Sequence, residues 1–353
     1  MGDRIGAADR RRIGVVGYGA GGHFFHTPFI QAVPGWELTG VVTRSDDRRA
    51  LLATEAPGVP AFDSLDALLD AGVDAVVITT PPETRQDLVL RALERGVHTV
   101  ADKPFAPDAA AGRLLADAAA RSGRILTVFH NRRLDTDIVT LRALITEGGL
   151  GDVWRVNSRF DLDDPATLET GPAHGLLRDL GAHLVDQMTH LFGPVARVDA
   201  HLDLTRIDGV EVDCGFVVNL HHANGVYTTV SSSKLNHLHE REILAYGSAG
   251  SYVSAMTDVQ VRQLFSGLRP ATHGSGWGVE EPARWGTLRT AAGPRSIPSA
   301  AGDYTQYYVQ LLAAVRGEGP PPVLLTEALH TLEILDAARQ SATEGRSVTL
   351  PLP

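Results

Sequence analysis

Cysteine and lysine are the scarcest informative residues in this sequence. The chain of 353 residues has one cysteine, Cys214, and only two of its 32 basic residues are lysines. A single cysteine excludes an internal disulfide framework and a zinc site built from several cysteines. The net charge of −10 leaves no basic excess, so nucleic acids and anionic membranes are not expected as partners.

Long apolar segments are also missing. No apolar run approaches the ~20 residues that a membrane-spanning helix needs. The first residues, MGDRIGAADRRR, carry charges with no apolar stretch behind them, so no signal peptide is expected and residues 1–10 are predicted to form a disordered tail. These absences favour a soluble, cytoplasmic protein. The hydrophobic content of 43% is ample for more than one domain core.

Short apolar runs alternate with helical patterns between residues 12 and 128. Strands are expected at 13–16, 38–43, 75–78, 98–101 and 125–128. Helices are expected at 22–33, 46–54, 64–71, 84–95 and 108–121. This alternation indicates βαβ units and a parallel sheet. Continuous apolar runs such as DAVVIT fit strands that are covered on both faces.

The pattern changes near residue 130. Helices are expected at 136–147, 176–192, 303–316 and 325–341, and strands at 152–161, 195–206, 211–220, 225–233, 238–247 and 251–256, with an irregular excursion at 266–302. Period-2 alternation in these strands favours an open, mostly antiparallel sheet. The predicted fold class is therefore α/β, with a doubly wound parallel sheet at 11–130 and an α+β domain at 131–353. The helix at 325–341 is expected to pack back on the first domain.

The segment IGVVGYGAGGHFFHTPFI, residues 13–30, carries a glycine motif. Gly17, Gly19 and Gly22 follow the first strand and open the first helix, as in the dinucleotide-binding turn of a Rossmann domain. The first glycine allows the tight turn, the second lets backbone approach a pyrophosphate, and the third lets the helix pack on the strand. A plain strand-to-helix turn is the alternative, but the following βαβ unit favours a dinucleotide.

The end of the second strand favours NADP over NAD. An NAD site usually places an acid there to bind the ribose 2′-hydroxyl, whereas an arginine suits a 2′-phosphate. The sequence has Thr43 and Arg44 at this place, and the first acid is Asp46. NADP is therefore the expected cofactor, and NAD stays possible if Arg44 is merely solvated.

The two lysines raise the question of what arginine could not do at their positions. Lys103, in HTVADKPF, directly follows a strand, at the edge of a parallel sheet where ligands bind. An ammonium there can hold a substrate hydroxyl and can lose a proton, which arginine cannot. The alternative is an ordinary surface lysine. Lys234, in SSSKLN, is interpreted as an exposed residue at the end of a strand.

The stretch GLLRDLGAHLVDQMTHLF, residues 175–192, carries four polar residues on one narrow stripe when it is read as a helix. At 100° per residue, Asp179, His183, Asp186 and His190 share a face opposite the apolar one. A carboxylate beside an imidazole can orient it, so His183 is a candidate proton donor or acceptor. A metal site and a solvated face are the alternatives, and His237–His239 on a strand is a weak source of further ligands. No metal is predicted.

Together these motifs resemble the Gfo/Idh/MocA oxidoreductase family over nearly the whole chain. The glycine turn followed by FHTPFI is similar to the signature of the NADP-dependent scyllo-inositol dehydrogenase branch. DKP corresponds to the family's Glu-Lys-Pro motif, with Asp102 in place of Glu, and RDLGAHLVDQ matches its Asp-x-Gly-x-His helix. VFHNRRLDTDIVTLRALI, residues 128–145, is similar to the crossover into the second domain.

The resemblance implies a catalytic trio, a cofactor-binding set and a substrate region. Lys103, Asp179 and His183 would form the trio. The cofactor would contact Gly17, Tyr18, Gly19, Gly22, Thr43, Arg44, Thr80, Pro81, Lys103 and Pro104. Asn131, Arg132 and the region of Phe160 would lie near the substrate. The C-terminal sheet would form a homo-oligomer, a dimer or tetramer.

Two departures from the family pattern concern the substrate pocket. TPPETR has Arg85 where the family often has histidine, and the loop 161–175 is shorter and less basic than in the inositol-type branch. The expected function is hydride transfer between NADP(H) and a secondary alcohol or ketone of a sugar or cyclic polyol. The alternatives are a non-catalytic NADP-binding regulator on the same fold, and a lyase or glycosidase that uses tightly held NAD.

Overall fold

The computed structural model describes residues 10–171 and 174–352, which form two compact units. The first unit comprises the chain up to His130 together with segments 267–275 and 304–325, and the second comprises the remaining segments. The predicted tail at 1–10 lies outside the described residues, except for Arg10, which is exposed. The domain boundary at residue 130 and the packing of helix 325–341 on the first domain stay predictions.

A six-stranded parallel sheet forms the centre of the first unit, in the order β3-β2-β1-β4-β5-β6. The chain places β2 and β3 on one side of β1 and β4, β5 and β6 on the other, so the sheet is doubly wound, as predicted. Its strands are β1 Arg11–Val16, β2 Trp36–Val42, β3 Ala61–Phe62, β4 Ala75–Ile78, β5 His98–Ala101 and β6 Leu126–Val128. All four residues of β4 are buried, which confirms that helices cover both faces.

Local capping residues determine where several helices of this unit begin and end. Ser45, Ser64 and Asp108 cap α2, α3 and α5 through side-chain oxygens that accept a backbone N–H. Gly123 ends α5 in the left-handed region, at φ +64°. The helices are α1 Thr27–Gln31, α2 Asp46–Glu55, α3 Leu65–Asp70, α4 Pro82–Glu94, α5 Ala109–Ser122, α9 Pro270–His273 and α10 Thr305–Val315.

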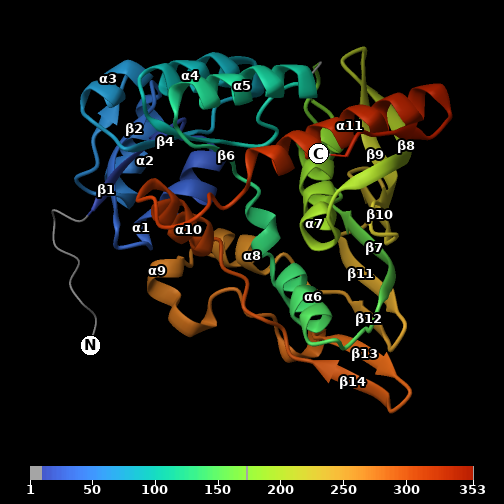
Figure 1. Cartoon of the computed structure of the whole chain (residues 1–353). Coiled ribbons are helices and arrows are strands. Elements are labelled where there is room, and N and C mark those ends of the chain that lie inside the picture. The colour runs from blue at the N-terminus through green and yellow to red at the C-terminus, as the bar shows by residue number, and fades with distance from the viewer. Residues whose placement is uncertain (1–9, 172–173, 353) are drawn as a thin grey trace. The chain divides into compact units, whose positions relative to one another are not determined.

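Helices from both ends of the chain cover this sheet. α3, α4 and α5 lie together along one face, and α1 and α10 lie next to each other on the other (Figure 1). α10 brings an aromatic cluster to the unit, because Tyr304, Tyr307 and Tyr308 are fully buried. The Trp36 indole N–H donates to the Tyr308 carbonyl at 2.9 Å, so the late helix completes the core of the early strands.

A nine-stranded sheet forms the second unit, in the order β14-β13-β12-β11-β7-β10-β9-β8-β15. Only β7 and β10 pair in parallel, so the sheet is mostly antiparallel, as predicted. Its strands are β7 Val153–Asp161, β8 Val195–Ile207, β9 Val210–His222, β10 Tyr227–Ser233, β11 Glu240–Gly247, β12 Ser251–Ser254, β13 Gly286–Thr290, β14 Gly293–Ile297 and β15 Val348–Thr349. Alternate residues of β10 are buried, which leaves the opposite face of this strand open.

One helical layer covers the buried face. It consists of α6 Thr136–Thr146, α7 Ala182–Phe192 and α11 Leu325–Glu344 (Figure 1). The short helix α8 Val259–Phe265 belongs to the same unit. Leu184, Val185 and Met188 of α7 are almost fully buried, and so are Leu335 and Ala338 of α11. The apolar stripes of these helices therefore supply one half of the core, and the inward residues of the sheet supply the other.

The prediction of an irregular excursion at 266–302 was wrong in part. The segment contains the β13–β14 hairpin, which extends the sheet at one edge. These edge strands are short and half exposed, so they lack the apolar alternation that identifies a strand. The two-residue strands β3 and β15 and the helix α8 were also missed, because such short elements depend on their neighbours rather than on local pattern.

His222, at the end of β9, is a buried histidine that is neutral in the folded protein. Its Nδ1–H donates to the Gly193 carbonyl at 2.8 Å, so Nε2 is the acceptor for the Thr228 hydroxyl at 3.0 Å. Burial lowers the pKa of His222 to about 4, and the nearby His330 adds to this effect. The imidazole therefore serves as a hydrogen-bond bridge that protonation would break.

The protein is expected to become less stable as the pH is lowered, because of this histidine. The unfolded chain takes up the proton near pH 6.5 and the folded chain only near pH 4, so acid favours unfolding within this window. Between pH 7.5 and 5 the loss from His222 should be about 2 kcal/mol. Urea unfolding of His222→Gln should show a correspondingly smaller loss across this range. His201→Gln, at a side chain that is 75% exposed, is the control. Equal pH dependence in His222→Gln and the wild type would contradict the assignment.

Candidate active site

The glycine turn between β1 and α1 has a different geometric requirement at each glycine. Gly17 has φ +103°, and a Cβ on it would lie 2.9 Å from the Thr79 carbonyl oxygen. A Cβ on Gly22 would lie 2.1 Å from the Gly17 carbonyl oxygen, so this glycine allows the helix to pack on the turn. A Cβ on Gly19 would meet only the Arg48 guanidinium, at 3.8 Å. The backbone at Gly19 is thus open to a ligand, and the turn fits a dinucleotide pyrophosphate.

The chain after this turn begins as a π-helix, Gly21–His26, before α1. π-turns are rare and often occur at functional sites. Tyr18, which belongs to the predicted cofactor set, is buried, and burial raises the pKa of its hydroxyl to about 12. The His23 imidazole on the π-helix lies against the Glu55 carboxylate of α2.

The end of β2 has positive rather than negative side chains. Thr43 is buried and its N–H donates to the Phe62 carbonyl. Arg44 is exposed, and its Nε donates to the Asp63 carbonyl at 3.2 Å. Ser45 caps α2 by accepting the Arg48 N–H at 3.4 Å. The Arg48 guanidinium also lies near Gly19, so a positive charge is available to an anion beside the glycine turn.

Arg85 links the loops that follow β4 and β5. It is buried, and its guanidinium donates to the Thr80 carbonyl at 2.6 Å and to the Pro104 carbonyl. Thr80, Pro81, Lys103 and Pro104 of the predicted cofactor set therefore belong to two loops that one side chain holds together. Pro104 follows a cis peptide bond. The sequence motif identified Arg85 as a departure from the family pattern but did not predict this bridging contact.

Asp102, next to Lys103, is the centre of a buried polar network. It accepts the Thr79 hydroxyl at 2.7 Å and the Lys103 backbone N–H at 2.9 Å, and His26 Nε2 lies 3.5 Å away. Burial alone would raise the pKa of Asp102, but the His26 hydrogen bond and the charges of His26 and Arg85 hold it well below its usual range. An ionised carboxylate therefore supports the backbone that presents Lys103.

The same network extends to the C-terminal part of the first unit. His26 Nδ1 lies 2.5 Å from the Tyr308 hydroxyl, and both side chains are fully buried. Burial raises the pKa of Tyr308 well above 10, so its hydroxyl keeps its proton. His26 and Tyr308 were missed in the sequence analysis. The only available signal was a histidine within the apolar segment FHTPFI, where an unpaired imidazole would be costly.

The second unit places Asp179 and His183 on consecutive helical segments. Asp179 lies in a π-helix, Leu177–Gly181, and His183 in the first turn of α7. The predicted stripe assumed 100° per residue throughout. That spacing holds for His183, Asp186 and His190 within α7, but not across the π-helix that contains Asp179. Asp186 does not share an open face with Asp179, because it is buried and accepts Arg133 through both oxygens, at 2.7 and 2.8 Å. His190 lies against Arg142 at 3.4 Å.

The interpretation of Lys234 as an exposed residue was wrong. Its side chain is 5% exposed and its Nζ lies 3.1 Å from Asp179 Oδ2. The prediction failed because strand alternation ends at Ser233, so the direction of the next side chain is not set by the pattern. His237 and His239 precede β11 rather than lying on a strand, and His237 has φ +59°. Within residues 10–171 and 174–352, no three His, Cys, Asp or Glu side chains form a group suited to a metal ion.

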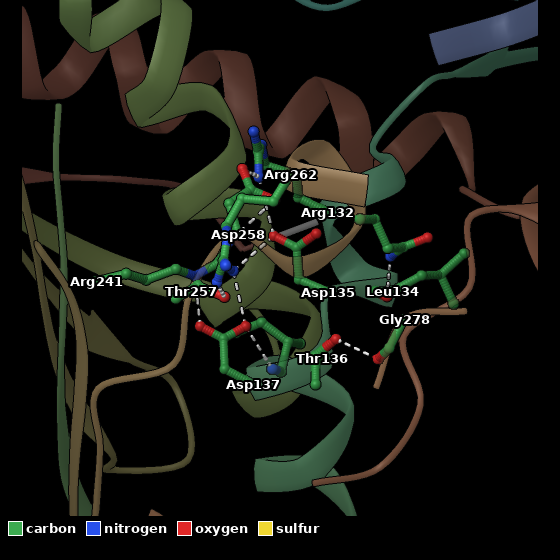
Figure 2. Close-up of polar contacts among 12 residues, drawn as sticks. Arg132, Leu134, Asp135, Thr136, Asp137, Arg241, Thr257, Asp258, Arg262 and Gly278 are labelled. Atoms are coloured by element: carbon green, nitrogen blue, oxygen red, sulfur yellow. Dashed lines mark hydrogen bonds and ion pairs between the residues drawn. The ribbon is translucent and has the colours of Figure 1, made fainter. Parts of the chain in front are cut away.

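Arg132 and Phe160, predicted near the substrate, lie together. Arg132 belongs to an ionic cluster that Figure 2 shows. The Arg132 guanidinium carbon is 5.2 Å from the centre of the Phe160 ring, and that of Arg241 is 4.8 Å from it. Arg132 also binds Asp258 at 2.8 Å and Asp135 at 3.2 Å.

Arg241 completes this cluster by bridging two carboxylates of the segment that begins α6. It lies 2.6 Å from Asp135 Oδ2 and 2.6 Å from Asp137 Oδ2 (Figure 2). Burial raises the pKa of Asp137, and the Arg241 charge opposes this rise. Asn131, the remaining predicted substrate residue, is buried at the start of the same segment. These contacts give the segment a rigid ionic scaffold, while the proposed substrate contacts stay a prediction.

Comparison with known proteins identifies both parts of the chain. Residues 11–130 match the model of the GFO_IDH_MocA oxidoreductase family with its NAD-binding Rossmann fold, and residues 142–350 match that of its C-terminal alpha/beta domain. The uncharacterized oxidoreductase YdgJ of Escherichia coli is 32% identical, over 97% of this chain and 99% of its own length. The scyllo-inositol 2-dehydrogenase (NADP(+)) IolW of Bacillus subtilis is 28% identical, over 97% and 96%.

Solved structures agree with these matches. A putative oxidoreductase from Klebsiella pneumoniae is 33% identical, with a TM-score of 0.87 over 98% of this chain and 96% of that one. In the described part of the chain, no helix is both long and apolar enough to cross a membrane. The chain belongs to the Gfo/Idh/MocA family of oxidoreductases and is an enzyme of the dehydrogenase and reductase class.

Proposed function

We propose that this enzyme transfers hydride between NADP(H) and a secondary alcohol or ketone of a sugar or cyclic polyol. The observation that carries the cofactor assignment is Arg48 beside an open glycine turn, with Arg44 rather than an acid shortly after the end of β2. Relatives support the substrate class: IolW is named a scyllo-inositol dehydrogenase, and a D-apiose dehydrogenase from Paraburkholderia graminis is 26% identical over 87% of this chain.

The proposed cofactor contacts follow from the geometry of the first unit. Gly17, Gly19 and Gly22 would accommodate the pyrophosphate, and the backbone N–H groups after the turn would face its charge. Arg44 and Arg48 would pair with the 2′-phosphate, since a guanidinium binds phosphate oxygens through two N–H groups. When bound, the nicotinamide supplies the hydride chemistry.

Lys103, Asp179 and His183 are the proposed catalytic residues. The Lys103 ammonium would hold the substrate oxygen and stabilise negative charge as it develops there. His183 would exchange the hydroxyl proton, and Asp179 would orient the imidazole. Asn131, Arg132 and Phe160 remain proposed substrate neighbours. Assembly into a homo-oligomer through the C-terminal sheet and a cytoplasmic location also stay predictions.

Steady-state kinetics and binding with paired cofactors test this proposal. NADPH should bind more tightly than NADH, and the double variant Arg44→Ala, Arg48→Ala should weaken NADPH binding about 30- to 100-fold with little effect on NADH, as expected for lost charged hydrogen bonds. Fluorescence titration measures both affinities. Arg49→Ala is the matched control, because Arg49 lies on the same helix but pairs with Asp63 at 2.5 Å.

A panel of inositols, aldoses and their keto forms then tests the reaction. Net NADPH oxidation with a keto-polyol is the expected result. NADPH binding without turnover of any compound in the panel would instead support a regulatory protein. Cleavage of a glycoside without net change in the cofactor would support a lyase or glycosidase.

A further inference from the structure

Lys234 has a position that the proposed function does not explain. It follows the last residue of β10, and its backbone N–H donates to the Cys214 carbonyl of β9 at 2.9 Å. Its ammonium is buried and donates to two oxygens, Asp179 Oδ2 at 3.1 Å and the Thr167 carbonyl at 3.2 Å. One cation therefore joins the proposed catalytic carboxylate to the segment between β7 and α7.

A buried ammonium must be paired, so these contacts are a requirement rather than an accident of packing. Lysine is also the unusual choice here, because thirty of the 32 basic residues in the chain are arginines. A compact ammonium can direct separate N–H donors at a carboxylate and a carbonyl, whereas the planar fork of arginine favours paired acceptors. The two separate acceptors at Asp179 and Thr167 therefore suit a lysine ammonium.

The backbone at Asp179 is held independently of Lys234. Asp213 on β9 accepts the Leu177 N–H at 2.6 Å and binds Arg339 at 2.9 Å, and the Asp179 N–H donates to the Gly175 carbonyl at 3.0 Å. These contacts fix the start of the π-helix. The Asp179 side chain is 49% exposed, so its carboxylate needs a partner to adopt one orientation. Lys234 supplies such a partner from β10.

The segment at Thr167 has one buried apolar residue, Leu168, directly after the turn. Pro165–Thr167 forms a short 3₁₀ turn with no buried residue. The start of the segment is fixed by β10, because the Leu162 N–H donates to the Ser233 carbonyl at 3.0 Å. The Lys234 ammonium is thus a second tether, farther along the segment, from the residue adjacent to Ser233.

We propose that Lys234 is a positioning residue that couples the 162–171 segment to the Asp179 carboxylate. The Thr167 carbonyl and the Asp179 carboxylate accept from one ammonium. A displacement of the segment therefore moves this positive charge relative to Asp179 and alters the hydrogen bond that Asp179 accepts. The inference rests on the proposed function only in giving Asp179 a catalytic role. Through Lys234, the segment would therefore take part in orienting the proposed catalytic carboxylate.

The test combines hydrogen exchange with a double-mutant cycle. Lys234→Met should increase amide exchange in residues 163–171, where the Thr167 and Leu168 N–H groups close the 3₁₀ turn. It should also lower kcat about 10- to 100-fold with a smaller change in KM, as misplacement of a catalytic group does. Lys234→Arg should recover part of kcat. In Asp179→Asn, adding Lys234→Met should cause little further loss, because Lys234 acts through Asp179.

Arg178→Met is the matched control. Arg178 is buried on the same π-helix and pairs with Asp336 at 2.6 Å, so its loss should lower Tm without increasing exchange at 163–171. The inference would be overturned if amide exchange at 163–171 were unchanged in Lys234→Met. It would also be overturned if the kcat of the double variant fell by the product of the two single losses. Hydrogen exchange reports on the tether even if no polyol is turned over, so failure of the proposed function is a separate outcome.

Discussion

Replacing Lys103 by methionine is expected to lower kcat by about 10³-fold while leaving the affinity for NADPH within about threefold of the wild type. Methionine keeps the apolar stem but removes the ammonium that would stabilise charge on the substrate oxygen. The loop itself should persist, because Asp102 binds the backbone N–H of residue 103 and Arg85 holds the Pro104 carbonyl. Steady-state turnover and fluorescence titration of NADPH measure the two quantities.

Lys103→Arg separates charge from proton exchange. Arginine keeps the positive charge but does not lose a proton at accessible pH. Turnover in this variant that exceeds that of Lys103→Met by an order of magnitude or more would assign the role to charge stabilisation. Turnover equal to that of Lys103→Met would indicate that lysine's proton or its compact shape is required. A Lys103→Met enzyme with wild-type turnover would reject the proposed catalytic role.

Replacing His183 by asparagine is expected to lower kcat by about 10²- to 10⁴-fold, the range for loss of a general acid or base. Asparagine keeps a polar side chain of similar reach but cannot exchange a proton near neutral pH. The loss should be largest where the wild-type pH–rate profile is at its maximum, and the limb due to the imidazole should disappear. The measurement is kcat across a pH series, with circular dichroism to verify folding.

His190→Asn is the control for the same helix. His190 lies seven residues after His183 in α7, contacts Arg142, and has its pKa lowered by burial and by the charge of Arg133. It has no place in the proposed mechanism, so its replacement should leave kcat and the pH profile near the wild type. Equal effects of the two replacements would contradict a specific role for His183.

The sequence by itself predicted the parts whose physics is local. Short apolar runs that alternate with helical patterns predict the parallel sheet, because each element carries its own local pattern. The caps that the structure shows at Ser45 and Asp108 are local as well. The spacing of Gly17, Gly19 and Gly22 is readable because each glycine answers a constraint within a few residues or at the adjacent strand. The place of Thr43 and Arg44 at the end of β2 is predictable for the same reason.

Only the tertiary structure determined which distant side chains meet. His26 pairs with Tyr308, 282 residues later, because α10 packs beside α1 in the first unit. Lys234 reaches Asp179 because β10 pairs with β9 so that Ser233 lies opposite Gly215, which sends the next residue into the layer beneath the π-helix. Such pairs depend on strand order and register, which arise from burying the whole apolar surface together, so no local pattern in the chain encodes them.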